Sequence, residues 1–280
     1  MRSREGSVFE AVNNSRNSEK TRDKSVHSLL KPLAFAGESA KLSALEHLYK
    51  TYNHREFVSP DPLQFLYDYP DKKDREIVAL IASSFAFGNV LQIIRAISLV
   101  LEKMPLPYDF LLTASEEKMK SVFSGFRYRF VGDSALVAFL MGIKSVLKNY
   151  GSIQECFKSG LSENDENILN ALQAFIENFF FKENYLLPKP SKKSACKRLN
   201  LFLRWMIRED EVDPGGWDGI DKSMLLVPLD VHMWRISQFL GFTKRKSADM
   251  NSVLEITNGF KKLNPADPVK YDFSLTRIGI

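Results

Sequence analysis

Apolar residues recur at helical spacing along most of the chain. In "SAKLSALEHLYKTYN", from Ser39 onward, Leu42, Leu45, Leu48 and Tyr49 form one apolar stripe at spacings of three and four residues. The same periodicity predicts further helices at residues 74–87, 89–103, 133–149, 166–182, 193–208, 230–240 and 248–260. Two-residue alternation is nearly absent, with "FRYRF" at 126–130 as an exception, so the pattern predicts an all-α fold.

Turn and capping residues separate these segments. Pro- and Gly-containing stretches such as "MPLPYDF", "LLPKPSKK" and "VDPGGWDG" are interpreted as linkers between helices. Capping signals that predict helix starts are Asp61 before Pro62, Asp267 before Pro268, and Ser152 with Glu155.

The N-terminal segment differs from the rest. Residues 1–38 are rich in Ser, Asn, Arg and Lys and have no sustained period, so we expect a disordered or loosely attached tail. Residues 39–280 are expected to form an all-helical region, either undivided or arranged as two helical subdomains around a cleft. With 280 residues, of which 44% are hydrophobic, the chain is long enough to bury a substantial core.

Composition narrows the class of protein. The net charge of +5 mildly favours anionic partners such as nucleic acid. The two cysteines, Cys156 and Cys196, lack the spacing of a zinc site or an iron–sulfur cluster, so we expect no metal and no cofactor. Without an apolar signal segment at the start, and with polar residues interrupting the apolar stretch 77–94, we expect a cytoplasmic protein that does not enter a membrane.

The segment "SKKSACKRLNLFLRWMIRED", residues 191–210, has the clearest amphipathic pattern. Its apolar positions predict one core-facing side: Leu199, Phe202, Leu203, Met206 and Ile207. Lys197, Arg204 and Arg208 share another stripe, at offsets of seven and eleven residues. This basic stripe is open to two interpretations, a solvated helix face or a ridge that contacts nucleic acid.

Lys197 lies near the predicted helix start, where the helix dipole disfavours a cation. Together with the neighbouring cations Lys193 and Arg198, this position favours a lowered pKa for Lys197 and hence the neutral amine that a nucleophile needs. Lys192 and Lys193 enter the same helix through a proline-broken turn, where free backbone N–H groups also suit a phosphate.

Asp230 is the one acid in the apolar run "VPLDVHMWRI". At the first position of a predicted helix its carboxylate either caps the helix, which stabilises it by about 1 kcal/mol, or faces a reacting centre. The two roles are compatible, because the dipole and backbone N–H groups at a helix start keep a carboxylate ionised.

A family resemblance joins these segments. "PLDVHMWRISQFLGF", with Asp230, His232 and Arg235 in the order D-x-H-x-x-R, resembles the catalytic-aspartate segment of the helix-hairpin-helix–GPD superfamily of DNA glycosylases. From about Ser39 to Ile280 the chain resembles an uncharacterised bacterial family that is similar to a distant branch of that superfamily, on the segments "SACKRLNLFLRWM", "VDPGGWDGI", "PLDVHMWRI" and "DPVKYDFSLTRIGI".

The resemblance implies an all-helical, helix-hairpin-helix glycosylase-like architecture with a central cleft. In bifunctional members a hairpin lysine attacks the deoxyribose and a later aspartate assists, which assigns these roles to Lys197 and Asp230. Their separation of 33 positions is more similar to that of the archaeal 8-oxoguanine glycosylases than to endonuclease III-like enzymes. The glycine-containing hairpin pattern is replaced here by "LLPKPSKKSAC", and two cysteines cannot supply an iron–sulfur cluster.

We therefore expect a DNA glycosylase or glycosylase/lyase of base excision repair that acts on a damaged purine. Lys192, Lys193, Arg198 and Arg204 are expected to bind nucleic acid, Trp217 is a candidate for the base pocket, and His232 and Arg235 are expected to support the site. Two alternatives remain open: a non-catalytic nucleic-acid-binding protein and an inert protein-interaction module on the same scaffold.

Overall fold

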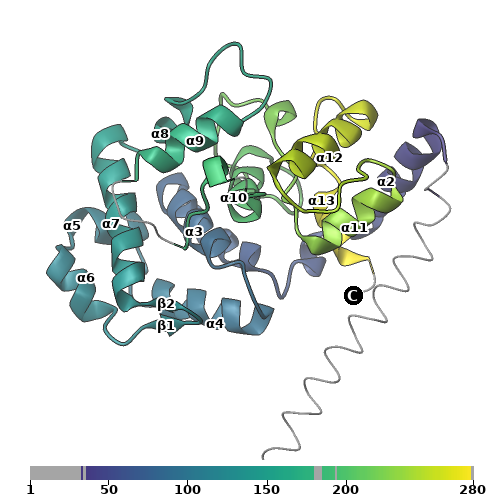
Figure 1. The fold of residues 1–280 in the computed structure, drawn as a ribbon. Coiled ribbons are helices and arrows are strands. Elements are labelled where there is room, and N and C mark those ends of the chain that lie inside the picture. The colour runs from purple at the N-terminus through teal and green to yellow at the C-terminus, as the bar shows by residue number, and fades with distance from the viewer. Residues whose placement is uncertain (1–32, 34–35, 180–184, 193, 279–280) are drawn as a thin grey trace, which may run out of the picture.

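The computed structural model describes residue 33 and residues 36–179, 185–192 and 194–278 (Figure 1). Within these ranges the chain is mostly helical, and its strands form one antiparallel hairpin of β1 (Arg127–Tyr128) and β2 (Val131–Gly132). The all-α prediction is thus confirmed for this part of the chain. The predicted tail, residues 1–38, falls almost wholly outside the described residues, as does Lys193.

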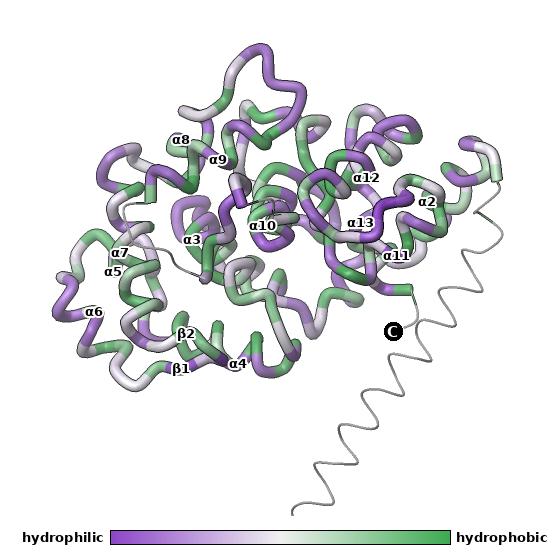
Figure 2. The backbone as a smooth tube through the Cα atoms, in the orientation of Figure 1, coloured by the Kyte–Doolittle hydropathy of each residue, from purple (hydrophilic) through white to green (hydrophobic). Residues whose placement is uncertain are grey.

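Each segment with sustained helical periodicity contains a helix. The longer helices are α2 (Glu38–Tyr52), α3 (Lys72–Ser84), α4 (Val90–Leu101), α7 (Asp133–Tyr150), α9 (Leu169–Glu177), α10 (Lys197–Ile207), α11 (Val231–Phe239) and α12 (Met250–Leu263). The largest departure from the predicted ranges is at α9, which ends at Glu177 instead of residue 182. In Figure 2 the hydropathy varies along each helix, as expected of helices with one buried face.

The periodicity missed four short helices, α5 (Pro107–Thr113), α6 (Glu116–Val122), α8 (Ile153–Lys158) and α13 (Asp272–Arg277). At six or seven residues each, they are too short to establish a period. The interpretation of "MPLPYDF" as a linker was wrong in part, because Pro107 begins α5, a position where its missing N–H costs nothing. The described residues also contain short 3-10 helices, each of three to seven residues: η2 (Arg55–Phe57), η3 (Pro62–Asp68), η4 (Pro190–Lys192) and η5 (Lys222–Met224).

The apolar stretch 77–94 divides between two core helices. Residues 77–84 belong to α3 and residues 90–94 to α4, and Asn89 separates them by accepting a hydrogen bond from the backbone N–H of Leu91 at 3.1 Å. Across the described ranges, no helix combines the length and the apolar character needed to span a membrane.

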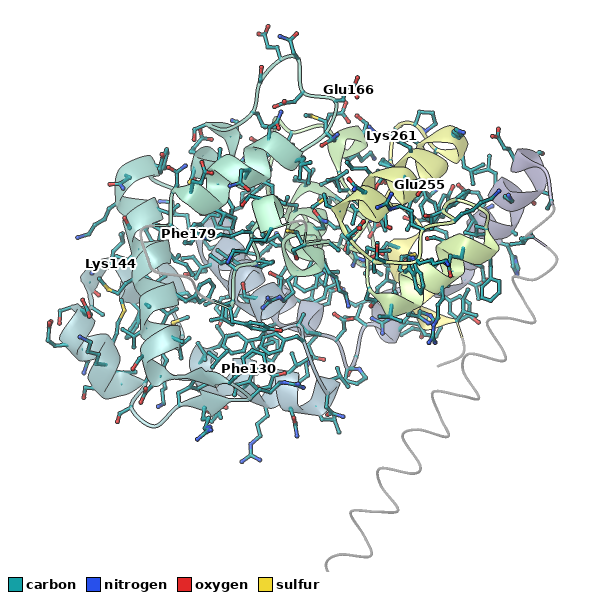
Figure 3. The ribbon with its side chains drawn as sticks, in the orientation of Figure 1. Phe130, Lys144, Glu166, Phe179, Glu255 and Lys261 are labelled. Atoms are coloured by element: carbon teal, nitrogen blue, oxygen red, sulfur yellow. The ribbon has the colours of Figure 1, made fainter. Side chains whose placement is uncertain are left out.

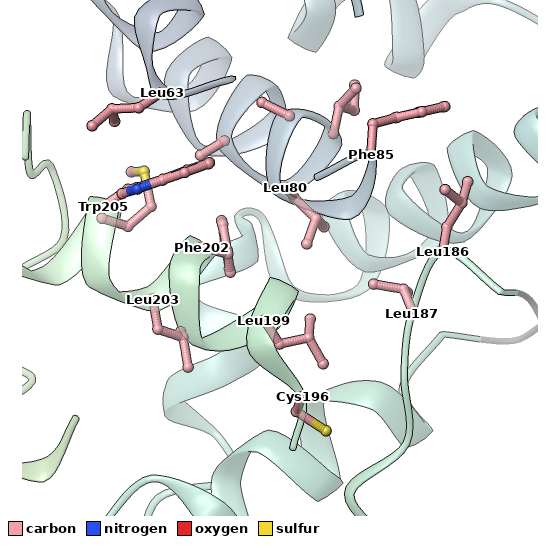
Figure 4. Close-up of a cluster of buried hydrophobic side chains, with 14 of the residues drawn as sticks. Leu63, Leu80, Phe85, Leu186, Leu187, Cys196, Leu199, Phe202, Leu203 and Trp205 are labelled. Atoms are coloured by element: carbon pink, nitrogen blue, oxygen red, sulfur yellow. The ribbon is translucent and has the colours of Figure 1, made fainter. Parts of the chain in front are cut away.

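Helix α10 lies at the centre and packs on α3 (Figure 1). The predicted apolar side of α10 is buried, and Figure 4 shows Leu199 and Phe202 in one cluster with Leu80 of α3 and with Phe85, which ends α3. Burial of each such side chain stabilises the fold by roughly 1.5–3 kcal/mol. The core therefore fixes the orientation of α10 and, with it, the position of Lys197 at its first turn.

Two groups of helices flank α10. On one side α2 packs against α12 and α13, and α11 packs against α13; on the other side lie α3 to α9 (Figure 1). An ion pair of 2.6 Å between Lys270 and Glu46 ties the C-terminal helices to α2. Residues far apart in sequence thus meet around α10, which is where the candidate site lies.

Candidate active site

Lys197 and Asp230 lie side by side. The Nζ of Lys197 donates a hydrogen bond to Oδ2 of Asp230 at 2.7 Å, and about a third of each side chain is exposed, 35% and 32%. Lys197 is the first residue of α10 and Asp230 is the N-cap residue of α11. The structure therefore brings together the two residues that the sequence assigned to one site.

Asp230 combines capping with pairing. Its Oδ1 accepts a hydrogen bond from the backbone N–H of Met233 at 2.8 Å, while Oδ2 accepts from Lys197. Burial alone raises the pKa of the Asp230 carboxyl, but the Lys197 ammonium, the hydrogen bonds and nearby His232 together hold this pKa below its usual 3.8. The carboxylate is therefore ionised near neutral pH and can accept a proton or stabilise positive charge.

The residue before Lys197 turns the chain sharply into α10. Cys196 has a left-handed φ of 47°, which residues with side chains rarely adopt, and its N–H donates to Oγ of Ser194 at 3.2 Å. The thiol is free and buried, and burial raises its pKa to about 11. In this segment a non-glycine residue thus takes a conformation that usually favours glycine, which places Lys197 at the helix start.

Lys197 and Asp230 line a cavity of about 300 Å³. Other lining residues come from the start of η3, the loop between α3 and α4, α4, α10, the segment before α11, and α13: Asp61, Pro62, Ala86, Phe87, Gly88, Ile93, Leu201, Arg204, Trp205, Pro228, Asp272, Phe273, Thr276 and Arg277. This volume is at the lower end of the range typical of small-molecule sites.

Three ion pairs line this cavity. Besides Lys197 with Asp230, Arg277 donates to Asp61 at 2.6 Å and Arg204 pairs with Asp272. Asp272 and Trp205 also each have a buried polar atom, Oδ1 and Nε1, without a hydrogen-bond partner among the described residues. The cavity wall therefore combines ion-paired charges with residues whose buried polar atoms lack a hydrogen-bond partner within the described ranges.

The basic stripe is not a solvated face, and Arg204, which was predicted to bind nucleic acid, is held in ion pairs within the protein at the cavity wall. Arg204 and Arg208 are 3% and 4% exposed. Arg204 binds Asp213 at 3.1 Å as well as Asp272, and Arg208 binds Asp213 and, at 3.0 Å, Asp267. These guanidinium groups form a buried ionic network that holds α10 against residues 210–213 and 267–272, because buried charges require paired partners. Asp267 accordingly binds Arg208 instead of capping a helix.

Arg198 binds within the protein. Its guanidinium donates to the carbonyl oxygens of Ser84 at 2.8 Å and Tyr185 at 2.6 Å, and lies over the rings of Phe87 and Tyr185. Burial lowers the pKa of Arg198. Its predicted phosphate contact is therefore not supported by this geometry, and it serves to join α10 to the loop after α3. Lys192 is exposed at the end of η4, and Lys193 lies outside the described residues.

Trp217 is part of the core and not of the cavity wall, so the prediction that it forms a base pocket is wrong. Its ring packs on Phe157 and Phe202, and its Nε1 donates to Oε2 of Glu76 at 3.0 Å. Burial raises the pKa of Glu76 to about 7, although hydrogen bonds from Ile153, Gln154 and Trp217 oppose this rise. Gly215 and Gly216, which precede Trp217, have φ values of 62° and 132°, which glycine adopts without strain.

The predicted supporting residues occupy α11 beside Asp230. His232 is half-buried and lowers the pKa of Asp230 through its charge, whereas Arg235 is exposed on the same helix. The position of His232 is compatible with the predicted support of the site.

Sequence reasoning missed several residues of the cavity wall. Asp61 and Arg277 are 216 positions apart, Trp205 lies outside the predicted apolar side of α10, and Phe273 and Thr276 lie on α13, which the periodicity missed. Nothing local in the sequence marks such residues, because the topology alone brings them together. Within the described ranges, no group of three or more His, Cys, Asp or Glu side chains is arranged to hold a metal ion.

Comparison with known proteins gives a family and no function. Residues 61–280 match the model of a family described as "Protein of unknown function (DUF2400)", a range that contains both Lys197 and Asp230. No curated protein matches the chain, and no solved structure does.

Proposed function

We propose that this chain, which belongs to the DUF2400 family, is a DNA glycosylase or glycosylase/lyase that removes a damaged purine such as 8-oxoguanine. The observation that carries the proposal is the 2.7 Å contact between Lys197 and Asp230 at the wall of a cavity of about 300 Å³. An amine beside a carboxylate in a cavity suits nucleophilic attack on a sugar carbon.

The proposed reaction begins with a proton transfer from Lys197 to Asp230. Nζ of Lys197 must lose a proton before it attacks C1′, and Asp230 accepts that proton. As the bond from Nζ to C1′ forms, the bond from C1′ to the base breaks, and the base departs with the bonding electron pair and takes the proton from Asp230. The restored carboxylate stabilises positive charge on the sugar. Opening of the sugar ring then moves one proton from the nitrogen to O4′ and leaves an iminium, the Schiff base.

The arrangement of helices supports a helix-hairpin-helix glycosylase-like architecture. Lys197 begins α10 after the turn that follows α9 and η4, and Asp230 caps the next long helix, α11. This is the order that the resemblance implies, with the nucleophile at the hairpin and the aspartate at a later helix start. Residues of both helix groups line the cavity, which supports the proposal of a central cleft.

Borohydride trapping tests the proposal. The protein is incubated with duplexes that contain 8-oxoguanine, uracil or an abasic site, and borohydride reduces any iminium to a stable protein–DNA adduct. We expect an adduct with the wild type and none with Lys197→Gln. Lys222→Gln is the matched control, because Lys222 is an exposed lysine on η5 outside the cavity, and it should leave the adduct unchanged.

The same assay separates the alternatives. DNA binding that weakens steeply with salt but gives no adduct supports a non-catalytic nucleic-acid-binding protein. No binding at low salt contradicts a role on DNA and leaves the protein-interaction module.

A further inference from the structure

Three aromatic rings form a cluster at the rim of the cavity, here called the aromatic platform: Phe87, Phe130 and Tyr185. Phe87 stacks on Phe130 with ring centroids 5.5 Å apart, and the Tyr185 ring meets Phe130 edge-on at 4.1 Å. Phe130 and Tyr185 are each 56% exposed. Large apolar side chains that gather on a surface indicate a site of interaction.

The hairpin between α6 and α7 holds Phe130 outward. Arg129 and Phe130 form its turn between the paired residues Tyr128 and Val131, and Figure 3 labels Phe130 at this hairpin. Arg129 has a left-handed φ of 54°, a conformation that is unfavourable for a residue with a side chain. The fold thus maintains a strained turn that exposes an aromatic ring.

Guanidinium groups accompany these rings. Arg129 lies over the rings of Phe87 and Phe130 at 6.0 and 5.8 Å, and Arg127 and Arg129 line an open groove of about 460 Å³ with Phe130. Neither arginine makes an ion pair with a carboxylate among the residues that the structure describes. The acid in this groove, Asp133, accepts instead from the backbone N–H groups of Gly125 and Ser134.

The platform is joined to the candidate active site. Phe87 lines the cavity that contains Lys197, and Arg198, the next residue after Lys197, lies over Phe87 and Tyr185 and donates to the backbone of Tyr185. Gly88, with a left-handed φ of 104°, lies against the Arg129 side chain, since a Cβ there would come within 2.7 Å of Nη1 of Arg129. A ligand bound in the cavity would therefore adjoin the rings.

We infer that the aromatic platform binds an unpaired base of DNA next to the nucleotide that enters the cavity. Exposed rings provide surfaces on which a base can stack, and unpaired arginines beside them suit the adjoining phosphates. Charge complementarity favours DNA over an apolar peptide with few acidic residues, because such a peptide would leave Arg127 and Arg129 without partners. That the nucleic acid is DNA rests on the proposed function.

The test compares two short duplexes of one sequence, fully paired or with a single unpaired adenine, by fluorescence anisotropy. We expect the wild type to prefer the duplex with the unpaired adenine. Phe130→Ala and Tyr185→Ala should each weaken that complex by about 5- to 100-fold, as expected for loss of one stacking surface, and weaken the paired complex by less than about 2-fold. Arg129→Ala should weaken both complexes and reduce the salt dependence by about one phosphate contact.

Leu106→Ala is the matched control, because Leu106 is 59% exposed and lies outside both cavities. Melting temperatures check that the variants fold. Equal losses on both duplexes, no loss in either ring variant, or no preference of the wild type for the unpaired adenine would overturn the inference.

The inference and the proposed function can fail separately. If borohydride traps Lys197 on abasic DNA while Phe130→Ala and Tyr185→Ala have no effect on binding, the inference about the aromatic platform fails and the proposed function stands. If no adduct forms but the preference for an unpaired adenine depends on Phe130 and Tyr185, the platform stands and the glycosylase proposal fails.

Discussion

Asp230 offers one carboxylate oxygen to Lys197 and the other to the helix that it begins. Oδ2 accepts from Nζ of Lys197 at 2.7 Å, and Oδ1 accepts from the backbone N–H of Met233 at 2.8 Å. Because separate atoms make the two contacts, a substitution can remove the charge and keep the cap.

Asp230→Asn should strongly slow trapping while the protein remains folded. Asparagine keeps an oxygen for the cap but cannot take a proton from Lys197, so adduct formation should slow by about 100-fold or more. Asp230→Ala should also lose about 1 kcal/mol of stability. Trapping rates and melting temperatures measure both effects.

Asp221→Asn is the control for the two Asp230 variants. Asp221 caps η5 by accepting a hydrogen bond from the backbone N–H of Ser223 at 2.8 Å, and it lies outside the cavity. It should leave trapping unchanged. If Asp230→Asn lowers the melting temperature but traps DNA at the wild-type rate, Asp230 is a cap alone.

Arg204→Ala should destabilise the fold by about 3–5 kcal/mol, because it leaves the buried carboxylates of Asp213 and Asp272 with fewer partners. Arg95→Ala, at an exposed position on α4, should change stability by less than about 0.5 kcal/mol. Urea unfolding measures both variants. A stable Arg204→Ala protein with weakened DNA binding would instead restore the predicted phosphate contact.

Asp272 should make stability depend on pH. The buried network around Arg204 and Arg208 contains more carboxylates than guanidinium groups, and burial raises the pKa of Asp272 to about 6 although Arg204 opposes this. Since the folded state then holds a proton that the unfolded state releases near pH 4, this contribution to stability should be present below about pH 4 and be lost as the pH rises to about 6.

Asp272→Asn should flatten that dependence. Asparagine resembles the protonated acid and keeps an oxygen for Arg204, so its melting temperature should vary less between pH 4 and 6 than that of the wild type. Identical pH profiles for the two proteins would show that Asp272 does not titrate in this range.

Trp217→Phe should lower stability without changing trapping at saturating protein. It removes the hydrogen bond to Glu76, at a cost of about 1–3 kcal/mol. Trp234→Phe is the control, because the indole N–H of Trp234 is buried without a partner among the described residues. Weakened trapping by Trp217→Phe at an unchanged melting temperature would show that Trp217 does contact the substrate.

Local patterns in the sequence predicted the longer helices and two residues of the site. Periodicity located α10 and α11, and Lys197 and Asp230 were conspicuous because each is a charge at a helix start. The interpretation of the basic stripe was incomplete, because spacing along a helix shows which face of the helix a residue lies on but not which residues cover that face. The carboxylates that bury Arg204 come from positions 213 and 272, which no local pattern connects to it.

The bond between Arg277 and Asp61 has a consequence for synthesis. Lys197 leaves the ribosome well before residues 272–277, which supply the last wall around it and the partner of Asp61. Until that segment folds back, the cavity beside Lys197 lacks the wall that α13 supplies. The cavity beside Lys197 is therefore complete only once residues 272–277 have been translated and have packed against the rest of the fold.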